Sequence, residues 1–483
     1  MKRFVRTAVL TLSMLAGSLS AAFAGVVGGS VRSTEGAGIE GVGIEGVVVT
    51  DGYNFAQTNS EGCFELEVDR RARHIYISTP SGYLVDTKGS IPLFYQPVSE
   101  EVESYDFTLT PNPNDDTKHT FFATADVQAT SKEDIDRYGL LAEDMRQLAE
   151  SIGGDSFSVD CGDIVGDSPW LYPLYVEAAD KAGIPVWRIL GNHDMNYNGK
   201  CFETSYATFE KTFAPNYYSM NRGKAHYIFL NNNFYVGREY FYVGYYTEAL
   251  LEWLEKDLSY VPKDALIIVV QHIPARLSPK QLPFEFNGYV MAEQTMNAGS
   301  LFELLKDYKK SHIISGHMHF NLNIEHAEGP MEHNTGAVCG TWWRGEICLD
   351  GTPMGYGVYE VDGSEVSWYY KSSGYDRNHQ LRAYKAGSKA DQPAAVVANV
   401  WNWDSEWSVE LYEDGVKTAT MTQFEGHDRA AYELCSDKEK VVYAWIAPVP
   451  TTHLFCAEPK NPNAKIEVRA TDRFGRTYTA ELE

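Results

Sequence analysis

Short apolar segments separated by turn residues fill the chain between residues 25 and about 112. They include the runs at 46–52, 62–68 and 75–78, with Asp-Gly and Glu-Gly pairs as turn signals. Short apolar strands joined through such turns are typical of all-β structure. The pattern therefore predicts a small N-terminal β-sandwich domain over residues 25–112.

Beyond a Pro- and Asn-rich stretch, the pattern changes to apolar strands that alternate with helix-like segments. This alternation predicts an α/β layer architecture for the centre of the chain. A capping pattern at Thr130 and Glu133 opens one helix, and Gly153-Gly154 ends it. The pattern also predicts helices over 248–258 and 301–309, and strands over 121–125, 157–161, 186–190, 227–230, 266–270 and 312–315.

After about residue 375 the chain returns to alternating apolar and polar positions. A segment at 385–393 contains Gly, Ser and Pro and is typical of a linker or long loop. We therefore expect a second small β-sandwich over 390–483, which leaves 117–374 for the central α/β unit.

The first residues carry the pattern of an export signal. Basic residues at 2, 3 and 6 precede an apolar run, and Ala22-Phe23-Ala24 is a small-x-small cleavage site. The apolar run is too short to anchor in a bilayer, and no second run of sufficient length follows. We expect a periplasmic or secreted protein without a membrane span, whose signal peptide over 1–24 is cleaved near Ala24.

Composition and charge narrow the possible partners. The 483 residues are 44% hydrophobic and 22% charged, which is the balance of a folded chain. The formal net charge of -25 opposes binding to nucleic acid or to an anionic membrane, so a phosphate-bearing ligand would need cations supplied locally. The seven cysteines cannot all pair within one chain, and Cys435 with Cys456 is a candidate disulfide.

Side chains that bind metals follow five of the expected strands. Because open α/β sheets gather ligand groups just past the carboxyl ends of their strands, these clusters point to one metal site. Their long separations along the chain allow each cluster to follow a different strand. The clusters are Asp126-Val127-Gln128, Gly162-Asp163, Gly191-Asn192-His193-Asp194, Gln271-His272 and Gly316-His317-Met318-His319.

In this order the clusters resemble the motifs of the calcineurin-like metallophosphoesterases, which are D-x-H, G-D-x-x-D, G-N-H-[DE], a lone His, and G-H-x-H. The similarity covers roughly residues 119–372, and the GNHD and GHMH pieces together make it specific. The flanking domains resemble those of secreted bacterial members. The resemblance implies a phosphoester hydrolase with an α/β fold, in which a central β-sandwich is flanked by helices and an all-β domain lies at each end.

The resemblance also implies which residues would hold two metal ions. Two neighbouring cations need a shared carboxylate, here Asp163, together with neutral imidazoles and an amide oxygen. The ions would be divalent or trivalent, with Mn, Fe and Zn as candidates. The first ion would be held by Asp126, Asp163 and His319, with Gln128 at the remaining motif position, and the second by Asp163, Asn192, His272 and His317.

For the chemistry, the resemblance implies attack by a metal-bridging hydroxide on a small phosphomonoester or phosphodiester, and the motifs leave open which of the two it is. His193 would donate a proton or a hydrogen bond to the reacting phosphate. Asp194 would orient the His193 ring and raise its basicity.

Two positions depart from the family pattern. Gln128 stands where the first motif has His, so the first metal position gains an amide oxygen or loses a ligand, which favours a harder ion. Gly166 stands where the second motif has Asp. Asp167 follows one position late, and we expect it outside the ligand set.

Substrate contacts are expected after the last motif. Trp342 and Trp343 are adjacent, so on a strand they would face opposite sides and one would line the pocket. Arg344 is a further candidate after this motif, and Tyr235 and Tyr242 are candidates that precede it in the chain.

Two other function classes compete with hydrolysis. A carbohydrate-binding or surface-interaction protein with a vestigial central domain would have lost the metal ligands, which are present. A zinc peptidase is suggested by His317-x-His319, but the chain contains no His-Glu-x-x-His run. We therefore favour phosphoester hydrolysis. A candidate sugar-binding face, for which packing is the favoured interpretation, comprises Trp401, Trp403 and Trp407.

Overall fold

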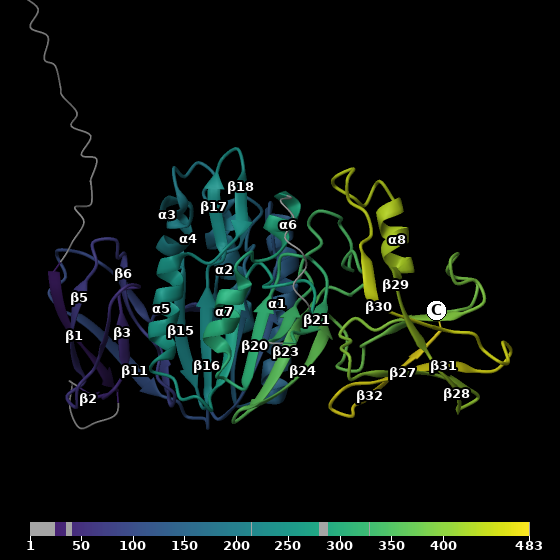
Figure 1. Ribbon diagram of the computed structural model, residues 1–483, viewed down its shortest axis with the longest axis horizontal. Coiled ribbons are helices and arrows are strands. Elements are labelled where there is room, and N and C mark those ends of the chain that lie inside the picture. The colour runs from purple at the N-terminus through teal and green to yellow at the C-terminus, as the bar shows by residue number, and fades with distance from the viewer. Residues whose placement is uncertain (1–24, 35–40, 214, 280–287, 328, 483) are drawn as a thin grey trace, which may run out of the picture.

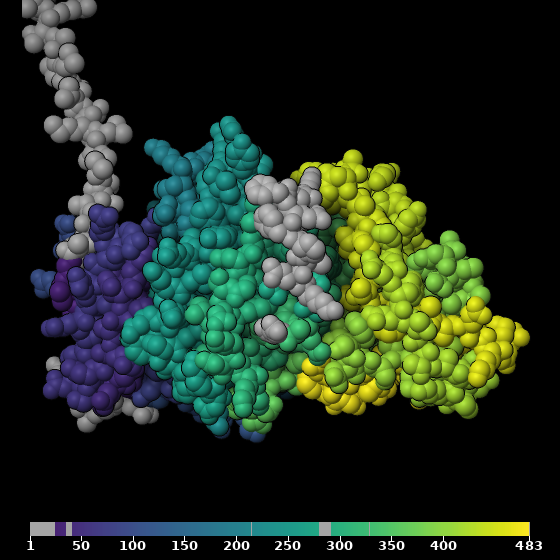
Figure 2. Space-filling model, in the orientation of Figure 1, coloured from purple at the N-terminus to yellow at the C-terminus, as the bar shows by residue number. Residues whose placement is uncertain are grey.

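Three units lie in a row along the molecule, coloured from purple through teal to yellow in Figures 1 and 2. The predicted signal peptide lies outside the described residues. No helix in the described part of the chain is long and apolar enough to cross a membrane. The computed structural model describes residues 25–34, 41–213, 215–279, 288–327 and 329–482.

The N-terminal unit consists of a five-stranded sheet, a four-stranded sheet and a small two-stranded sheet. Alternate side chains of its longer strands are buried, as in the pattern of Cys63–Val68. The five-stranded sheet comprises β1 (Gly25–Ser33), β2 (Val42–Gly43), β5 (Cys63–Val68), β7 (Tyr83–Val85) and β11 (Tyr105–Pro111). The others comprise β3 (Val48–Thr50), β4 (Phe55–Gln57), β6 (His74–Ile77) and β10 (Tyr95–Pro97), and β8 (Thr87–Lys88) with β9 (Ile91–Pro92).

Two larger sheets form the central unit, and all six strands predicted there are present. One sheet comprises, in spatial order, β14 (Val186–Arg188), β13 (Asp155–Asp160), β12 (Lys118–Thr124), β23 (Gly355–Asp362) and β24 (Glu365–Ser372). The other comprises β15 (Tyr217–Arg222), β16 (Ala225–Leu230), β19 (Leu266–Gln271), β20 (Lys310–Ser315), β22 (Met331–Asn334) and β21 (Leu322–Glu325). A separate hairpin comprises β17 (Asn233–Gly237) and β18 (Phe241–Gly244).

The two central sheets face each other across an aromatic core. The ring of Tyr227 on β16 lies 5.4 Å from that of Phe121 and 5.2 Å from that of Phe157, measured between centroids. Strands β12, β13 and β14 run parallel, as do β16, β19, β20 and β22. The carboxyl ends of the strands in each parallel group therefore gather at one edge, and the predicted α/β fold class is confirmed.

Helices cover the sheets, with α5 and α7 in front of the six-stranded sheet in Figure 1. The prediction for α5 is confirmed, whereas α7 lies earlier than predicted because its buried face ends at Leu305 and lysines follow. The cap of α1 is Ser131, paired with Asp134, one position after the predicted cap. The helices are α1 (Lys132–Ile152), α2 (Tyr172–Ala179), α3 (Phe202–Ser205), α4 (Ala207–Thr212), α5 (Glu248–Leu258), α6 (Gly288–Glu293) and α7 (Ala298–Leu305).

Two four-stranded sheets and one helix form the C-terminal unit. The first sheet comprises β25 (Arg382–Tyr384), β26 (Val396–Asn399), β30 (Pro450–Ala457) and β29 (Thr422–His427), and the second β28 (Val416–Thr420), β27 (Ser408–Glu413), β31 (Ile466–Thr471) and β32 (Thr477–Glu481). Helix α8 (Arg429–Ser436) is capped by Asp428 and departs from the all-β expectation for this unit.

The structure bears on three expectations for the C-terminal unit: two need correction, and the favoured interpretation of Trp401 and Trp407, packing, is confirmed. Strand β25 pairs with β26, so the unit begins before residue 390, and the predicted linker at 385–393 connects two strands of one sheet. Cys435 and Cys456 are both free thiols. Trp401 and Trp407 are buried, so they pack inside the unit and do not form a sugar-binding face.

The N-terminal unit is joined to the central unit by buried polar contacts. The Arg188 guanidinium on β14 donates to Ser90 Oγ at 2.7 Å, and the Tyr217 hydroxyl donates to the carbonyl of Gly52 at 2.8 Å. Apolar side chains of both units form one continuous core. The interface is therefore part of the folded core.

His74 gives the N-terminal unit a predictable sensitivity to acid. The side chain is 8% exposed, and its ring lies edge-on to Tyr95 at 5.3 Å. Burial, assisted by the Arg73 charge, lowers the pKa of His74 to about 4 from 6.5. Because the folded pKa is the lower one, its stabilising contribution is complete above pH 6.5 and is lost as the pH falls toward 4.

We expect acidification to pH 5 to remove about 2 kcal/mol of stability through this group. The variant His74→Phe keeps a ring beside Tyr95 but cannot titrate, so its stability should fall less between neutral pH and pH 5. Urea-unfolding midpoints of both proteins at the two pH values measure the difference. An equal fall in both would contradict the assignment.

Candidate metal centre

The predicted ligands converge at the carboxyl ends of the parallel strands. Asp126 and Gln128 follow β12, Asp163 follows β13, and Asn192 opens the short 3-10 turn η3 (Asn192–Asp194) after β14. From the other sheet, His272 follows β19, and His317 and His319 follow β20. Both sheets thus contribute to one site, as strand-end ligands in an α/β fold should.

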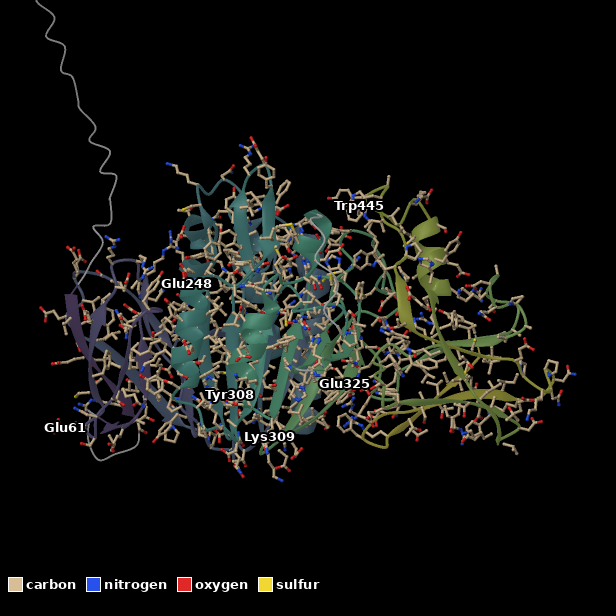
Figure 3. The ribbon with its side chains drawn as sticks, viewed as in Figure 1. Glu61, Glu248, Tyr308, Lys309, Glu325 and Trp445 are labelled. Carbon is tan, nitrogen blue, oxygen red and sulfur yellow. The ribbon has the colours of Figure 1, made fainter. Side chains whose placement is uncertain are left out.

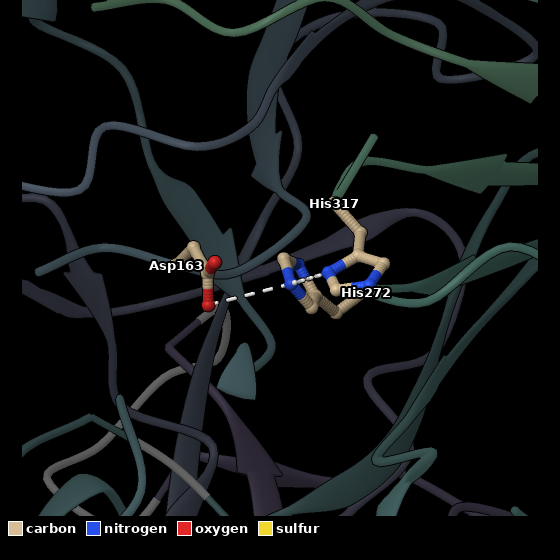
Figure 4. Close-up of side chains that lie close together, drawn as sticks. All are labelled: Asp163, His272 and His317. Carbon is tan, nitrogen blue, oxygen red and sulfur yellow. Dashed lines mark hydrogen bonds and ion pairs between the residues drawn. The ribbon is translucent and has the colours of Figure 1, made fainter. Parts of the chain in front are cut away.

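Two sets of ligand atoms share one carboxylate. Asp163, His272 and His317 offer atoms that lie within 4.8 Å of one another, and Figure 4 shows this set. Asp126, Asp163 and His319 form a second such set. Asp163 belongs to both, which is the arrangement that two neighbouring cations require.

The two remaining predicted ligands, both amides, lie beside these sets. Asn192 Oδ1 is 3.0 Å from His272 Nε2. Gln128 Nε2 donates to Asp163 Oδ2 at 2.9 Å, so the amide that replaces the family's His reaches the shared carboxylate. The structure therefore brings all seven predicted ligand residues together.

Backbone carbonyls fix which nitrogen each imidazole presents to the site. His272 Nδ1 donates to the carbonyl of Cys161 at 2.8 Å, and His317 Nε2 donates to that of Ala292 at 3.0 Å. When both rings are neutral, His272 Nε2 and His317 Nδ1 consequently carry the lone pairs, and these two nitrogens lie 3.2 Å apart (Figure 4). Two facing lone pairs repel each other unless one nitrogen binds a proton or both nitrogens bind a metal ion.

His319 supplies an independent observation for the other set. Its Nε2 is buried and makes no hydrogen bond to any described residue. It lies 3.4 Å from Asp126 Oδ1. A buried nitrogen without a hydrogen-bond partner beside a buried carboxylate is the donor arrangement that a cation satisfies.

Negative charge concentrates in the site and attracts positive charge. Asp126 and Asp163 are at most 1% exposed. Burial of His272 disfavours its charged form, but the Asp163 carboxylate outweighs burial and raises the pKa of His272 to about 9. A metal ion at this position would displace that proton.

The backbone at the ligands adopts a conformation that side chains ordinarily avoid. Positive φ is uncommon for residues other than Gly and costs about 1–3 kcal/mol each in sparsely populated regions. Such strain persists where the surrounding structure imposes it. Five of the nine non-Gly residues with positive φ in the described part of the chain are predicted ligands: Asp126, Gln128, Asp163, His317 and His319.

Two motif glycines allow the ligand loops to approach closely. A Cβ on Gly191 would lie 2.1 Å from Asp163 Oδ1. A Cβ on Gly316 would lie 2.5 Å from Ala125 Cβ and 2.7 Å from Asp126 Oδ2. Any larger residue at either position would displace a predicted ligand.

The expected partnership between Asp194 and His193 is wrong. Asp194 is fully buried and accepts hydrogen bonds from the backbone N–H groups of Gly191, Ile164 and Val165, at 2.8, 3.1 and 3.2 Å. The reason is local: residues 192–194 form η3, and Asp194 closes that turn by accepting the Gly191 N–H. Its role is to tie two ligand loops together.

Asp167 takes the place that the sequence assigned to Asp194. Its Oδ1 lies 2.9 Å from His193 Nδ1. Burial opposes protonation of His193, but the charge of Asp163 and the hydrogen bond to Asp167 outweigh it and raise the pKa of His193. The signal in the sequence was the Asp of the second motif standing one position late.

The candidate substrate residues differ in how close they lie to the metal centre. Trp342 lies 5.3 Å from His193 and 5.1 Å from His319 between ring centroids. Trp343 lies 5.6 Å from His319, but it is buried and donates to the carbonyl of Ile347. The two tryptophans lie in a turn, so the argument from opposite faces of a strand does not apply to them.

The other three candidates lie in different places. The Tyr242 ring is 6.0 Å from that of His317. Tyr235 is buried and donates to the carbonyl of Tyr197. Arg344 is exposed and lines a separate cavity that also contains Arg137 and Tyr375.

Comparisons with known proteins identify the family of the chain. A family model described as calcineurin-like phosphoesterase matches residues 119–321, and models for the N- and C-terminal regions of such proteins match 30–112 and 332–478. The chain belongs to this family, and it is a hydrolase acting on phosphoester bonds. Among curated proteins, none matches the chain.

Solved structures with similarity to the chain include two phosphatases. A dimetal phosphatase from Danio rerio is 14% identical over 53% of this chain and 96% of its own, with a TM-score of 0.38. A purple acid phosphatase from seeds of Lupinus luteus is 12% identical over 73% of this chain and 68% of its own, with a TM-score of 0.41.

Variants of the two aspartates separate their roles. Asp194→Ala leaves three buried backbone N–H groups without their acceptor, at about 1–3 kcal/mol each, so we expect a lower melting temperature and loss of metal on dialysis. Asp167→Ala should keep both the melting temperature and the metal content, while lowering turnover. Metal analysis and thermal unfolding measure the contrast, and the reverse pattern would contradict it.

Proposed function

We propose that this protein hydrolyses a small phosphomonoester or phosphodiester with two metal ions held across Asp163. The observation that carries the proposal is the pair of imidazole nitrogens, His272 Nε2 and His317 Nδ1, that face each other at 3.2 Å beside this shared carboxylate. When bound, the two ions supply Lewis-acid activation of water and phosphate.

The donor set fits such ions. Asp126, Asp163 and His319 would hold the first, with Gln128 beside them, and Asp163, Asn192, His272 and His317 would hold the second. An amide oxygen in place of imidazole suits a harder ion at the first position, and Mn, Fe and Zn are the candidates for the two positions.

His193 is the group of this chain that acts on the substrate. Because its Nδ1 pairs with Asp167, its Nε2 is the nitrogen that can reach a phosphoester. The side chain is 20% exposed, and the backbone N–H of the same residue donates to Asp163 Oδ1 at 2.8 Å. His193 can therefore give a proton or a hydrogen bond to the leaving oxygen.

The cellular setting is part of the same proposal. The basic and apolar pattern of residues 1–24 supports export. The net charge of -25 opposes a nucleic-acid polymer as the ligand, and bound metal ions would supply locally the positive charge that a small phosphoester needs.

The variant Asp163→Asn tests the shared carboxylate. We expect it to lose both ions and to have no measurable hydrolysis, because it removes the negative charge common to both sets. The control Asp136→Asn, at an exposed position on α1, should match the wild type in metal content and turnover. Two retained equivalents of metal with normal turnover in Asp163→Asn would refute the bridging assignment.

The variant His193→Ala tests the proton donor. General acid catalysis contributes about 10²–10⁴ in rate, so turnover should fall by that order while both metals remain bound. The loss should be larger for alkyl phosphates than for nitrophenyl phosphate, whose leaving group departs without a proton. Equal losses on both would assign His193 to charge stabilisation, and loss of metal would contradict its role.

A further inference from the structure

Trp342 connects the metal centre to the C-terminal unit. Two of the rings that contact Trp342 belong to the site: His193 at 5.3 Å and His319 at 5.1 Å between centroids. Two more rings that contact Trp342 come from a distant part of the chain: Tyr443 at 6.3 Å and Trp445 at 5.6 Å. Five aromatic rings therefore run without interruption from the predicted metal ligands to the C-terminal unit.

The segment that carries these two rings is held firmly in place. The Val442 N–H donates to the carbonyl of Trp342 at 2.7 Å. Val441 and Ile446 are buried, and they belong to a hydrophobic cluster that also contains Trp343. The position of Tyr443 and Trp445 beside the metal centre is thus fixed by backbone and core contacts of their neighbours.

Tyr443 and Trp445 themselves face solvent. Their side chains are 44% and 64% exposed, and their rings stack at 5.6 Å with only 13° between the planes. Figure 3 shows Trp445 at the upper end of the C-terminal unit, on the side of the central unit. Large aromatic side chains left exposed at the edge of a reactive site are typical of a ligand-binding surface.

We propose that Tyr443 and Trp445 form a stacking subsite for a planar, uncharged ring in the leaving group of the substrate. The inference rests on the proposed function above. Trp342 contacts His193, the residue placed at the leaving oxygen, so a group that leaves past His193 meets Trp342 and then the stacked pair. None of the cation–π pairs among the described residues involves these three rings, so no Arg or Lys side chain in the described part of the chain occupies their faces.

Flat rings stack on indole and phenol faces through dispersion and quadrupole interactions that require no hydrogen-bond pattern. The subsite would therefore select phosphoesters of heteroaromatic or aryl alcohols over those of ringless alcohols. A nucleoside phosphate and a simple aryl phosphate share this chemistry, and a comparison between them separates the two sources.

The experiment compares kcat/KM of the wild type with the double variant Tyr443→Ala/Trp445→Ala on four monoesters. These are a nucleoside monophosphate, an aryl phosphate, a hexose phosphate and glycerol phosphate. Loss of stacking should lower kcat/KM for at least one of the two planar esters by roughly 5- to 150-fold, mainly through KM. The kcat/KM for glycerol phosphate should be unaffected. The single variant Trp445→Phe, which keeps an aromatic ring, should lose less kcat/KM on the planar esters than the double variant does.

The control variant is Tyr432→Ala, on α8 of the same unit and 61% exposed, which should match the wild type on all four esters. An equal loss on glycerol phosphate would show that the two rings only support the fold and would overturn the subsite. An unchanged kcat/KM on both planar esters, or the largest loss on the hexose phosphate, would overturn it as well.

Binding separates this inference from the proposed function. Quenching of tryptophan fluorescence by the nucleoside monophosphate and the aryl phosphate measures affinity without turnover. If the wild type hydrolyses none of the four monoesters, the phosphomonoester form of the proposed function fails, while weaker binding of a planar ester to the double variant still supports the subsite. Equal affinity of both proteins for both planar esters overturns the subsite even if hydrolysis is confirmed.

Discussion

The demand for positive charge around the buried carboxylate of Asp163 is the constraint on which the rest of the site depends. Asp163 belongs to two sets of imidazole and carboxylate ligands, and beside it the ring nitrogens of His272 and His317 face each other at 3.2 Å. Backbone carbonyls hold the tautomers of His272 and His317, and the glycine at 191 leaves room for the carboxylate. The positive φ values at the ligand positions are the strain that this convergence imposes.

The two facing sheets make the convergence possible. In each sheet several parallel strands end at the edge that carries the ligands. Residues far apart in the sequence therefore meet there without sharing a helix or hairpin. Aromatic packing between Phe121, Phe157 and Tyr227 fixes the spacing of the sheets. The core thereby sets the distance between ligands from the first sheet and ligands from the second.

The structural units do not follow the boundaries of the family matches. The match to the C-terminal region begins at residue 332, yet β23 and β24 complete the first central sheet. The C-terminal unit also touches the centre of the protein, because Val442 binds the backbone of Trp342. The third unit is therefore part of the surroundings of the metal centre.

The sequence by itself determined six strands of the central sheets, the helices α1 and α5, and the ligand clusters, because local periodicity specifies an element and strand ends specify where ligands gather. Only the tertiary structure decided which aspartate meets His193, since η3 directs Asp194 into the backbone and leaves the ring to Asp167. It alone placed Tyr443 and Trp445 beside Trp342, because no local pattern encodes a contact between segments about a hundred residues apart.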